Sequence, residues 1–111
     1  MADTFISHQT VEEYLLSFPG AKLDYPFGEE VAVYKVQDKM FALIQEKKLP
    51  VNLSLKCDPI LSSVLQKKYE SVLPGYHLNK KHWITIILSG QMPWDEVKDL
   101  IVLSYNLAAG A

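Results

Sequence analysis

The sequence contains no arginine, so all eleven of its basic residues are lysines. A guanidinium group can form two parallel hydrogen bonds with a guanine edge, whereas a lysine ammonium acts as a single point charge. Bidentate reading of bases by arginine is therefore excluded. If this chain binds a nucleic acid, we expect the binding to depend on phosphate contacts and to weaken as salt is added.

Cysteine is also scarce, because Cys57 is the only one in the chain. A single cysteine cannot form an internal disulfide, which fits a reducing compartment. The longest uncharged apolar run, residues 83–88, is far shorter than the roughly 20 residues that cross a bilayer. The first residues lack the basic start and apolar stretch of a signal peptide. These features predict a cytoplasmic protein with no membrane partner.

Common catalytic and metal-site motifs are missing. The sequence has no CxxC, HExxH or glycine-rich phosphate loop. His77 and His82, with Cys57 as a third ligand, do not have the spacing of a zinc site. Cys57 directly precedes a predicted helix, which can activate a thiol, but its place in the strand pattern faces the core, where a thiol is inert. We therefore predict no enzyme activity, no metal and no cofactor.

The pattern of apolar residues predicts one domain over residues 1–111, long enough to bury a two-layer core. Alternating apolar residues predict strands over 31–37, 39–47, 51–57 and 82–88, and residues 21–27 form a short extended segment unsuited to the sheet centre. Helical spacing predicts helices over 11–18, from 59 and from 93. This order predicts an α+β two-layer sandwich, in which helices pack on one face of an antiparallel sheet.

Local signals predict the helix ends and their buried faces. Thr10 and Glu13 have capping-box spacing, which places the first helix after Thr10. Asp58 and Pro59 are a favoured start for the second helix. Residues 71–81 are predicted to form a loop. The apolar stripes of the second and third helices, expected to be buried, contain Ile60, Leu61, Val64, Leu65 and Tyr69, and Trp94, Val97, Leu100, Ile101, Ser104, Leu107 and Ala108.

Charge is distributed unevenly along the chain. Residues 35–81 hold nine lysines and four acids, a net charge of +5, while the remainder has two lysines and nine acids, a net charge of −7. Such an asymmetry suggests a basic face on an acidic body, which suits an anionic partner. The two predicted hairpin turns place Lys39 at one tip and Lys47 and Lys48 at the other.

Segment 74–83 concentrates polar hydrogen-bonding groups just before the last predicted strand. Its two lysines, Lys80 and Lys81, could contact phosphates or form an ordinary solvated turn. Asn79 could contact a ligand or brace the loop as an Asx turn, which requires no ligand. Trp83 could stack on an unpaired base, but we expect it in the core because Thr85 and Ile87 share its strand face.

Segments 19–21, 33–36, 39–42, 52–59, 76–83 and 104–105 resemble the MmcQ/YjbR family of small bacterial cytoplasmic proteins, and the most specific match is the run His77-Leu78-Asn79-Lys80-Lys81-His82-Trp83. The resemblance implies a CyaY/frataxin-like fold. It also implies a likeness to a "double wing" DNA-binding architecture, in which two hairpins act as wings. The acids Glu12 and Glu13 do not extend into a frataxin-like acidic ridge, so iron delivery is not implied.

These observations predict a small non-catalytic protein that binds DNA or another polyanion through its exposed sheet face and hairpin tips. An alternative is a protein-interaction module or homodimer that uses the same face. A third hypothesis is an enzyme or small-molecule carrier with a pocket between loop 76–82 and the sheet. The predicted contacts to nucleic acid are made by Lys35, Lys39, Lys47, Lys48, Lys56, His77, Asn79, Lys80 and Lys81.

Overall fold

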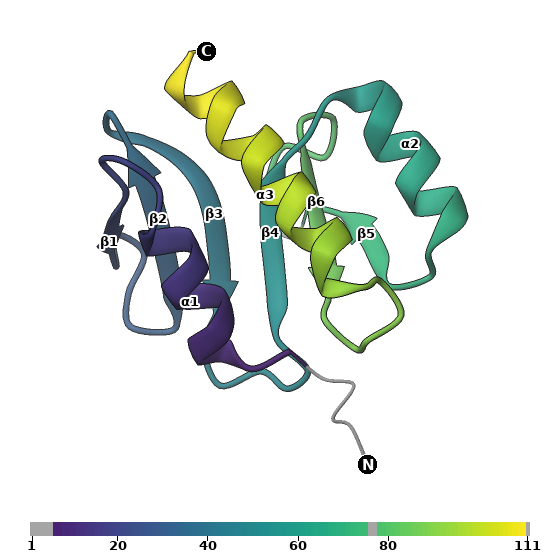
Figure 1. The fold of residues 1–111 in the computed structure, drawn as a ribbon, viewed down its shortest axis with the longest axis horizontal. Helices are drawn as coiled ribbons and strands as arrows, with labels where there is room; N and C mark the ends of the chain where they lie inside the picture. Colours follow the sequence, from purple (N-terminus) through teal and green to yellow (C-terminus); the bar gives the residue numbers. More distant parts are fainter. Residues whose placement is uncertain (1–5, 76–77, 111) are drawn as a thin grey trace.

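The computed structural model of this chain describes residues 6–75 and 78–110. Six strands form one antiparallel sheet in the order β1-β2-β3-β4-β6-β5, and three helices pack on one side of it (Figure 1). The predicted α+β architecture is confirmed. The elements are α1 (His8–Leu16), β1 (Lys22–Asp24), β2 (Val31–Val36), β3 (Lys39–Gln45), β4 (Asn52–Lys56), α2 (Pro59–Lys68), β5 (Val72–Pro74), β6 (Trp83–Ile87) and α3 (Trp94–Ala109).

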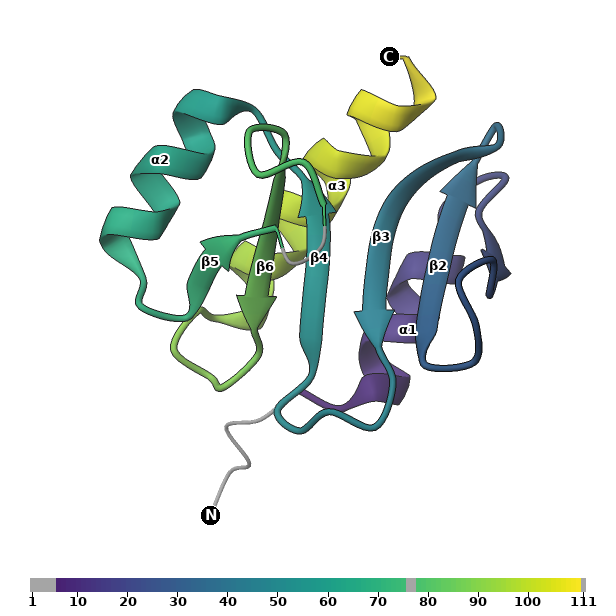
Figure 2. The same cartoon turned by 180° about the vertical axis from the view of Figure 1, so that it is seen from behind.

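Both predicted hairpins are present, and their turns lie at opposite ends of the sheet. Gln37 and Asp38 connect β2 to β3 with φ angles of 52° and 64°, the two positive values that a type I′ turn requires. Lys47 and Lys48 lie in the connection from β3 to β4. Because successive antiparallel strands reverse direction, the two hairpin tips point away from each other (Figure 2).

A β-bulge in β3 turns Phe41 toward the helices. Tyr34 pairs with Ala42 and Lys35 with Met40, so Phe41 is the extra residue and shares the helix-facing core with Ala42. Strict alternation would instead have placed Phe41 on the opposite face. The ring packs 6.2 Å from Phe18 and 5.4 Å from Tyr105, measured between centroids. Phe41 thereby connects two elements to the sheet: helix α3 and the segment that follows α1.

Ser104 holds α3 against the centre of the sheet. It is fully buried, and its Oγ donates a hydrogen bond to the carbonyl oxygen of Phe41. Ser104 Oγ also accepts a hydrogen bond from the backbone N–H of Lys56 at 2.9 Å. This bridge ties one helix to two neighbouring strands and fixes the end of β4, where the candidate site begins.

The first helix starts one turn earlier than predicted. Its N-cap is Ser7, whose side chain accepts a hydrogen bond from the backbone N–H of Thr10 at 3.1 Å. The helix runs from His8 to Leu16, so Thr10 lies inside its first turn. The capping-box prediction was wrong because a second capping residue stands three positions upstream.

A short edge strand lies within the segment predicted to be a loop. Val72–Pro74 forms β5, which pairs with β6 through Val72 and Ile86 and through Leu73 and Thr85. Three residues ending in proline carry too little pattern to be recognised as a strand. The extended segment at 22–24 forms the opposite edge strand, β1, as its composition indicated.

Three residues predicted to be buried are instead exposed. Ile60 and Val64 on α2 are 76% and 54% exposed, and Leu107 on α3 is 54% exposed. The two helices diverge from each other (Figure 1), and Leu107 lines a hollow that also contacts Leu61 of α2. Helix α2 packs on the sheet through Leu65 and buries Ser62.

Among the described residues, no helix has the length and apolarity needed to cross a membrane.

Tyr34 has a fully buried hydroxyl that makes no hydrogen bond within the part of the chain that the structure describes. Burial, reinforced by the charge of Glu12, raises the pKa of this phenol above its ordinary value. We expect Tyr34→Phe to leave the free energy of unfolding unchanged or to raise it by up to about 1 kcal/mol, because the variant removes an unpaired polar group. Urea denaturation measures this change.

Tyr69→Phe provides the matched control for this prediction. The Tyr69 hydroxyl donates a hydrogen bond to Glu96 Oε1 at 2.6 Å, so its removal should lower stability. A loss in Tyr34→Phe as large as that in Tyr69→Phe would show that the buried hydroxyl has a partner.

Candidate nucleic-acid interface

The sheet face opposite the helices carries a second, smaller apolar cluster. Val33, Leu43 and Trp83 are its buried members, with Met40 and Leu78 packed against them. Figure 2 shows that no helix lies in front of β2, β3, β4 and β6 on this side. The face is therefore uncovered by helices, while its apolar centre is already closed by its own side chains.

Cross-strand pairing arranges three lysines in one row across this face. Lys22 of β1 pairs with Lys35 of β2, and Lys35 pairs with Met40 of β3. Ala42 of β3 pairs with Leu55 of β4, so Lys56 lies at the same end of the sheet, where it pairs with Trp83 of β6. Neighbouring strands lie about 4.8 Å apart, so the Cα atoms of Lys22 and Lys56 are separated by roughly 15 Å. We call Lys22, Lys35 and Lys56 the lysine row. Lys22 was missed in the sequence because its place depends on the pairing of β1.

Two members of the lysine row have defined neighbours. Lys35 Nζ lies 3.6 Å from Asp24 Oδ2, and Lys56 Nζ lies 5.9 Å from the centroid of the Trp83 ring. Trp83 is only 6% exposed, which confirms that it is a core residue. Its ring is therefore not available as a stacking platform for a base, and this face offers charge rather than an aromatic surface.

The loop before β6 is braced from within. Asn79 Oδ1 accepts a hydrogen bond from the backbone N–H of Lys81 at 2.9 Å, the Asx-type brace that the sequence suggested. Lys80 Nζ donates a hydrogen bond to the carbonyl oxygen of Gly75 at 3.3 Å. Lys81 is exposed. The predicted contact at His77 lies outside the described residues.

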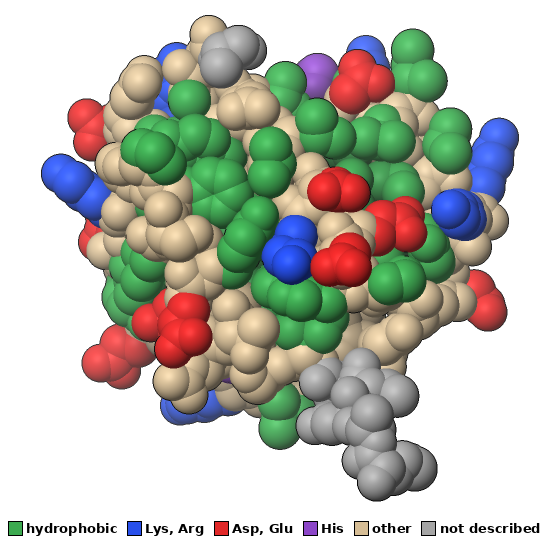
Figure 3. All heavy atoms as spheres, viewed as in Figure 1, with side chains coloured by type: hydrophobic (Ala, Val, Ile, Leu, Met, Phe, Trp, Pro, Cys, Tyr) green, Lys and Arg blue, Asp and Glu red, His purple; other side chains and the backbone are tan. Residues whose placement is uncertain are grey.

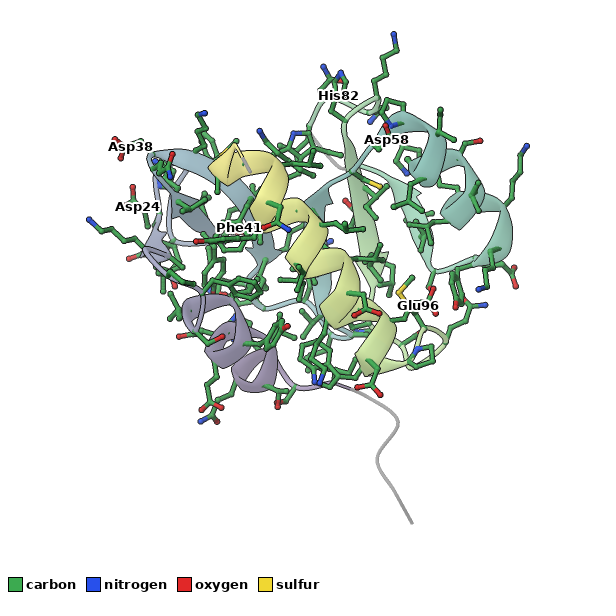
Figure 4. The ribbon with its side chains drawn as sticks, turned by 45° about the horizontal axis from the view of Figure 1, so that its top comes forward. Asp24, Asp38, Phe41, Asp58, His82 and Glu96 are labelled. Carbon is green, nitrogen blue, oxygen red and sulfur yellow. The ribbon has the colours of Figure 1, made fainter. Side chains whose placement is uncertain are left out.

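The structure divides the predicted lysines between the two ends of the sheet. Figure 4 shows Asp38, Asp58 and His82 along one edge of the molecule, and these residues neighbour the predicted lysines of that end. Lys47 and Lys48 lie at the other end, in the turn between β3 and β4. The two groups cannot form one continuous site. The end near the loop holds Lys35, Lys39, Lys56, Lys80 and Lys81.

Acidic residues gather on the helix side of the molecule. Asp95, Glu96 and Asp99 lie on the first half of α3, where Lys98 Nζ is 3.3 Å from Asp95 Oδ1. Figure 3 shows several acidic side chains beside a single lysine over this helix. Since the lysine row lies on the opposite side of the sheet, an anion would be repelled by one face and attracted by the other.

Cys57 lies next to the lysine row but faces the helices. It is 5% exposed, as its strand position predicted, and burial together with the charge of Asp58 raises the pKa of its thiol to about 11. The thiol is therefore protonated at neutral pH and is not an activated nucleophile. Within residues 6–75 and 78–110, no group of three or more histidine, cysteine, aspartate or glutamate side chains could hold a metal ion.

Comparison with known proteins identifies relatives along nearly the whole chain. The YjbR family model matches residues 16–107. The uncharacterised proteins YbdF of Escherichia coli O157:H7 and YjbR of Escherichia coli K12 are 39% identical over 100 residues and 33% identical over 96 residues. These alignments cover 90% of this chain and 82% of YbdF, and 86% of this chain and 81% of YjbR.

Solved structures share both the fold and part of the sequence. A crystal structure from Deinococcus radiodurans has a TM-score of 0.89 at 33% identity, covering 96% of this chain and 81% of that protein. A crystal structure from Pseudomonas syringae has a TM-score of 0.79 at 29% identity, covering 93% of this chain and 99% of that protein. Together with the family match, these similarities show that the chain belongs to the YjbR family.

Proposed function

We propose that this chain binds nucleic acid by contacting its phosphates with the lysine row and with the neighbouring Lys80 and Lys81. The observation that carries this proposal is the strand register, which aligns Lys22, Lys35 and Lys56 on the sheet face that the helices leave uncovered. A row of cations along a surface suits a chain of phosphates.

The chemistry of the surface favours contacts that ignore base sequence. Ammonium groups act as point charges, and contacts to phosphates position a nucleic acid without reading its bases. The Trp83 ring is covered, so base stacking adds little. A phosphate would compete with Asp24 for Lys35, and this exchange requires little energy because exposed ion pairs are weak. We expect DNA and RNA of different sequences to bind with similar affinity.

Two matched double variants test the proposal. Lys80→Ala/Lys81→Ala and Lys47→Ala/Lys48→Ala remove the same charge from adjacent lysines at opposite ends of the sheet. We expect the first variant to weaken binding to a labelled single-stranded DNA by about tenfold at low salt, and to reduce the slope of log K against log salt by roughly 1.4. Fluorescence anisotropy measures both quantities.

The control variant should bind nearly as tightly as the unchanged protein. Equal losses in the two variants would show that only net charge matters, and would contradict a site at one end. An unchanged affinity in Lys80→Ala/Lys81→Ala would remove the loop from the proposed interface.

The alternative of a homodimer through the uncovered sheet face has less support. Val33, Leu43 and Trp83 are buried within one chain, so that face offers little apolar area to a second copy. A cytoplasmic location fits the single reduced thiol of Cys57 and is part of the proposal.

A further inference from the structure

An open groove is lined by residues of α2, α3 and the end of β4, and Asp58 and His82, labelled in Figure 4, are among them. It consists of two adjoining hollows of about 390 Å³ and 570 Å³, which share Lys56, Cys57, Asp58 and Leu107. Volumes in this range are typical of sites for small molecules. Neither hollow is needed for the proposed phosphate contacts of Lys80 and Lys81.

The smaller hollow is apolar. Its walls carry Leu61 from α2 and Leu100, Leu103 and Leu107 from α3. Leu103 and Leu107 are 47% and 54% exposed, although they continue the apolar stripe of α3. The Cys57 thiol remains neutral because its pKa is raised to about 11, so it adds no charge to this wall. This half suits an apolar group.

The larger hollow is the more polar of the two, and it contains one lysine and one aspartate. It is lined by Lys56, Asn79 and His82, and no described carboxylate lies within 4.0 Å of Lys56 Nζ. Asp58 also lines it, but its Oδ2 accepts two backbone N–H groups of α2 at 3.0 and 3.1 Å. The negative charge of Asp58 is thus directed to the helix start, while the nitrogen donors are left to meet an anion.

We propose that this groove binds a small amphiphilic carboxylate, with its apolar body between α2 and α3 and its carboxylate at Lys56. An apolar trench with a cation at one end complements a molecule that has an anionic group at one end. A single ammonium balances a monoanion, which favours a carboxylate over a phosphate dianion. The apolar part of the groove is separate from the proposed nucleic-acid interface, because Leu103 and Leu107 lie on the helix side of the sheet. Lys56 belongs to both, so a phosphate and the carboxylate would compete for its ammonium.

Isothermal titration calorimetry with decanoate tests the apolar half. Leu107→Asp places a charge in the groove at an exposed position that the fold tolerates, and should weaken decanoate binding by about tenfold or more. Val102→Asp is the matched control, because Val102 is 37% exposed on the same helix and does not line either hollow. The control should bind decanoate as the unchanged protein does.

The neutral analogue decanol tests the polar half. Lys56→Met should weaken decanoate binding by about tenfold while leaving decanol binding unchanged, because only the carboxylate uses the ammonium. Absence of saturable decanoate binding, or equal binding by Leu107→Asp and the unchanged protein, would overturn the proposal. Leu107→Asp should retain nucleic-acid binding, so failure of this inference is distinguishable from failure of the proposed function.

Discussion

Replacing Phe41 by alanine should lower the free energy of unfolding by about 3–5 kcal/mol, the largest effect that we expect from a single substitution. The side chain is fully buried and packs against Phe18 and Tyr105, so its removal leaves a cavity where helix α3 and the segment after α1 meet the sheet. Domains of this size are stable by only about 5–15 kcal/mol. Urea denaturation followed by tryptophan fluorescence measures the loss.

Phe27→Ala is the matched control for this variant. Phe27 is 63% exposed, so the same chemical change should alter stability by no more than about 0.5 kcal/mol. Similar small losses in both variants would contradict the position of Phe41 at the bulge and in the core.

Replacing Gly75 by alanine should lower stability by about 1–3 kcal/mol and also weaken nucleic-acid binding. A Cβ atom at this position would lie 2.6 Å from Trp83 Cβ, closer than real Cβ atoms approach, and a tight 3.1 Å from the Trp83 carbonyl oxygen. The backbone must therefore move, which disturbs the hydrogen bond from Gly75 N–H to Trp83 O and the contact from Lys80 Nζ to Gly75 O. Denaturation and anisotropy measure the two effects.

Gly28→Ala separates backbone strain from damage to the loop. Gly28 has a φ of +107°, and a Cβ atom there would meet nothing within 4 Å, so alanine at this position is strained but meets no clash. This variant should lose about 1 kcal/mol or more of stability and keep its affinity for nucleic acid. Wild-type stability in Gly75→Ala would refute the close approach between Gly75 and Trp83.

Much of the fold could be predicted because it is encoded by local patterns. Alternation identified β2, β3, β4 and β6, and Asp58 before Pro59 marked the start of α2, where the structure shows the aspartate as N-cap. The prediction failed where two local signals competed, as Ser7 and Thr10 did for the first cap. It also failed where a feature depends on pairing, as the Phe41 bulge does.

The candidate interface was only partly predictable, because it is built by contacts between distant segments. The sequence indicated a basic region, and the structure places Lys35, Lys56 and Lys80 toward one end. The sequence alone gave no reason to add Lys22, because Lys22 joins the lysine row only through the register between β1 and β2. The separation of Lys47 from the others follows from strand direction.

The groove shows a different limit of sequence reasoning. A stripe such as Leu100, Leu103 and Leu107 indicates that one side of a helix is apolar, but does not say what that side contacts. Helix α3 packs on the sheet with part of its stripe and exposes the rest where α2 diverges. The prediction for Leu107 was wrong for this reason. The predictions for Ile60 and Val64 were wrong because α2 buries Ser62 and Leu65 instead.

Chemical-shift mapping of the backbone amides during titration with a short single-stranded DNA tests the central claim most directly. We predict salt-sensitive shifts at Lys22, Lys35 and Lys56 and across residues 78–83, with little change at Lys47, Lys48 or along α1. Shifts confined to the turn between β3 and β4, or no shifts at low salt, would contradict the assignment of this sheet end as the nucleic-acid interface.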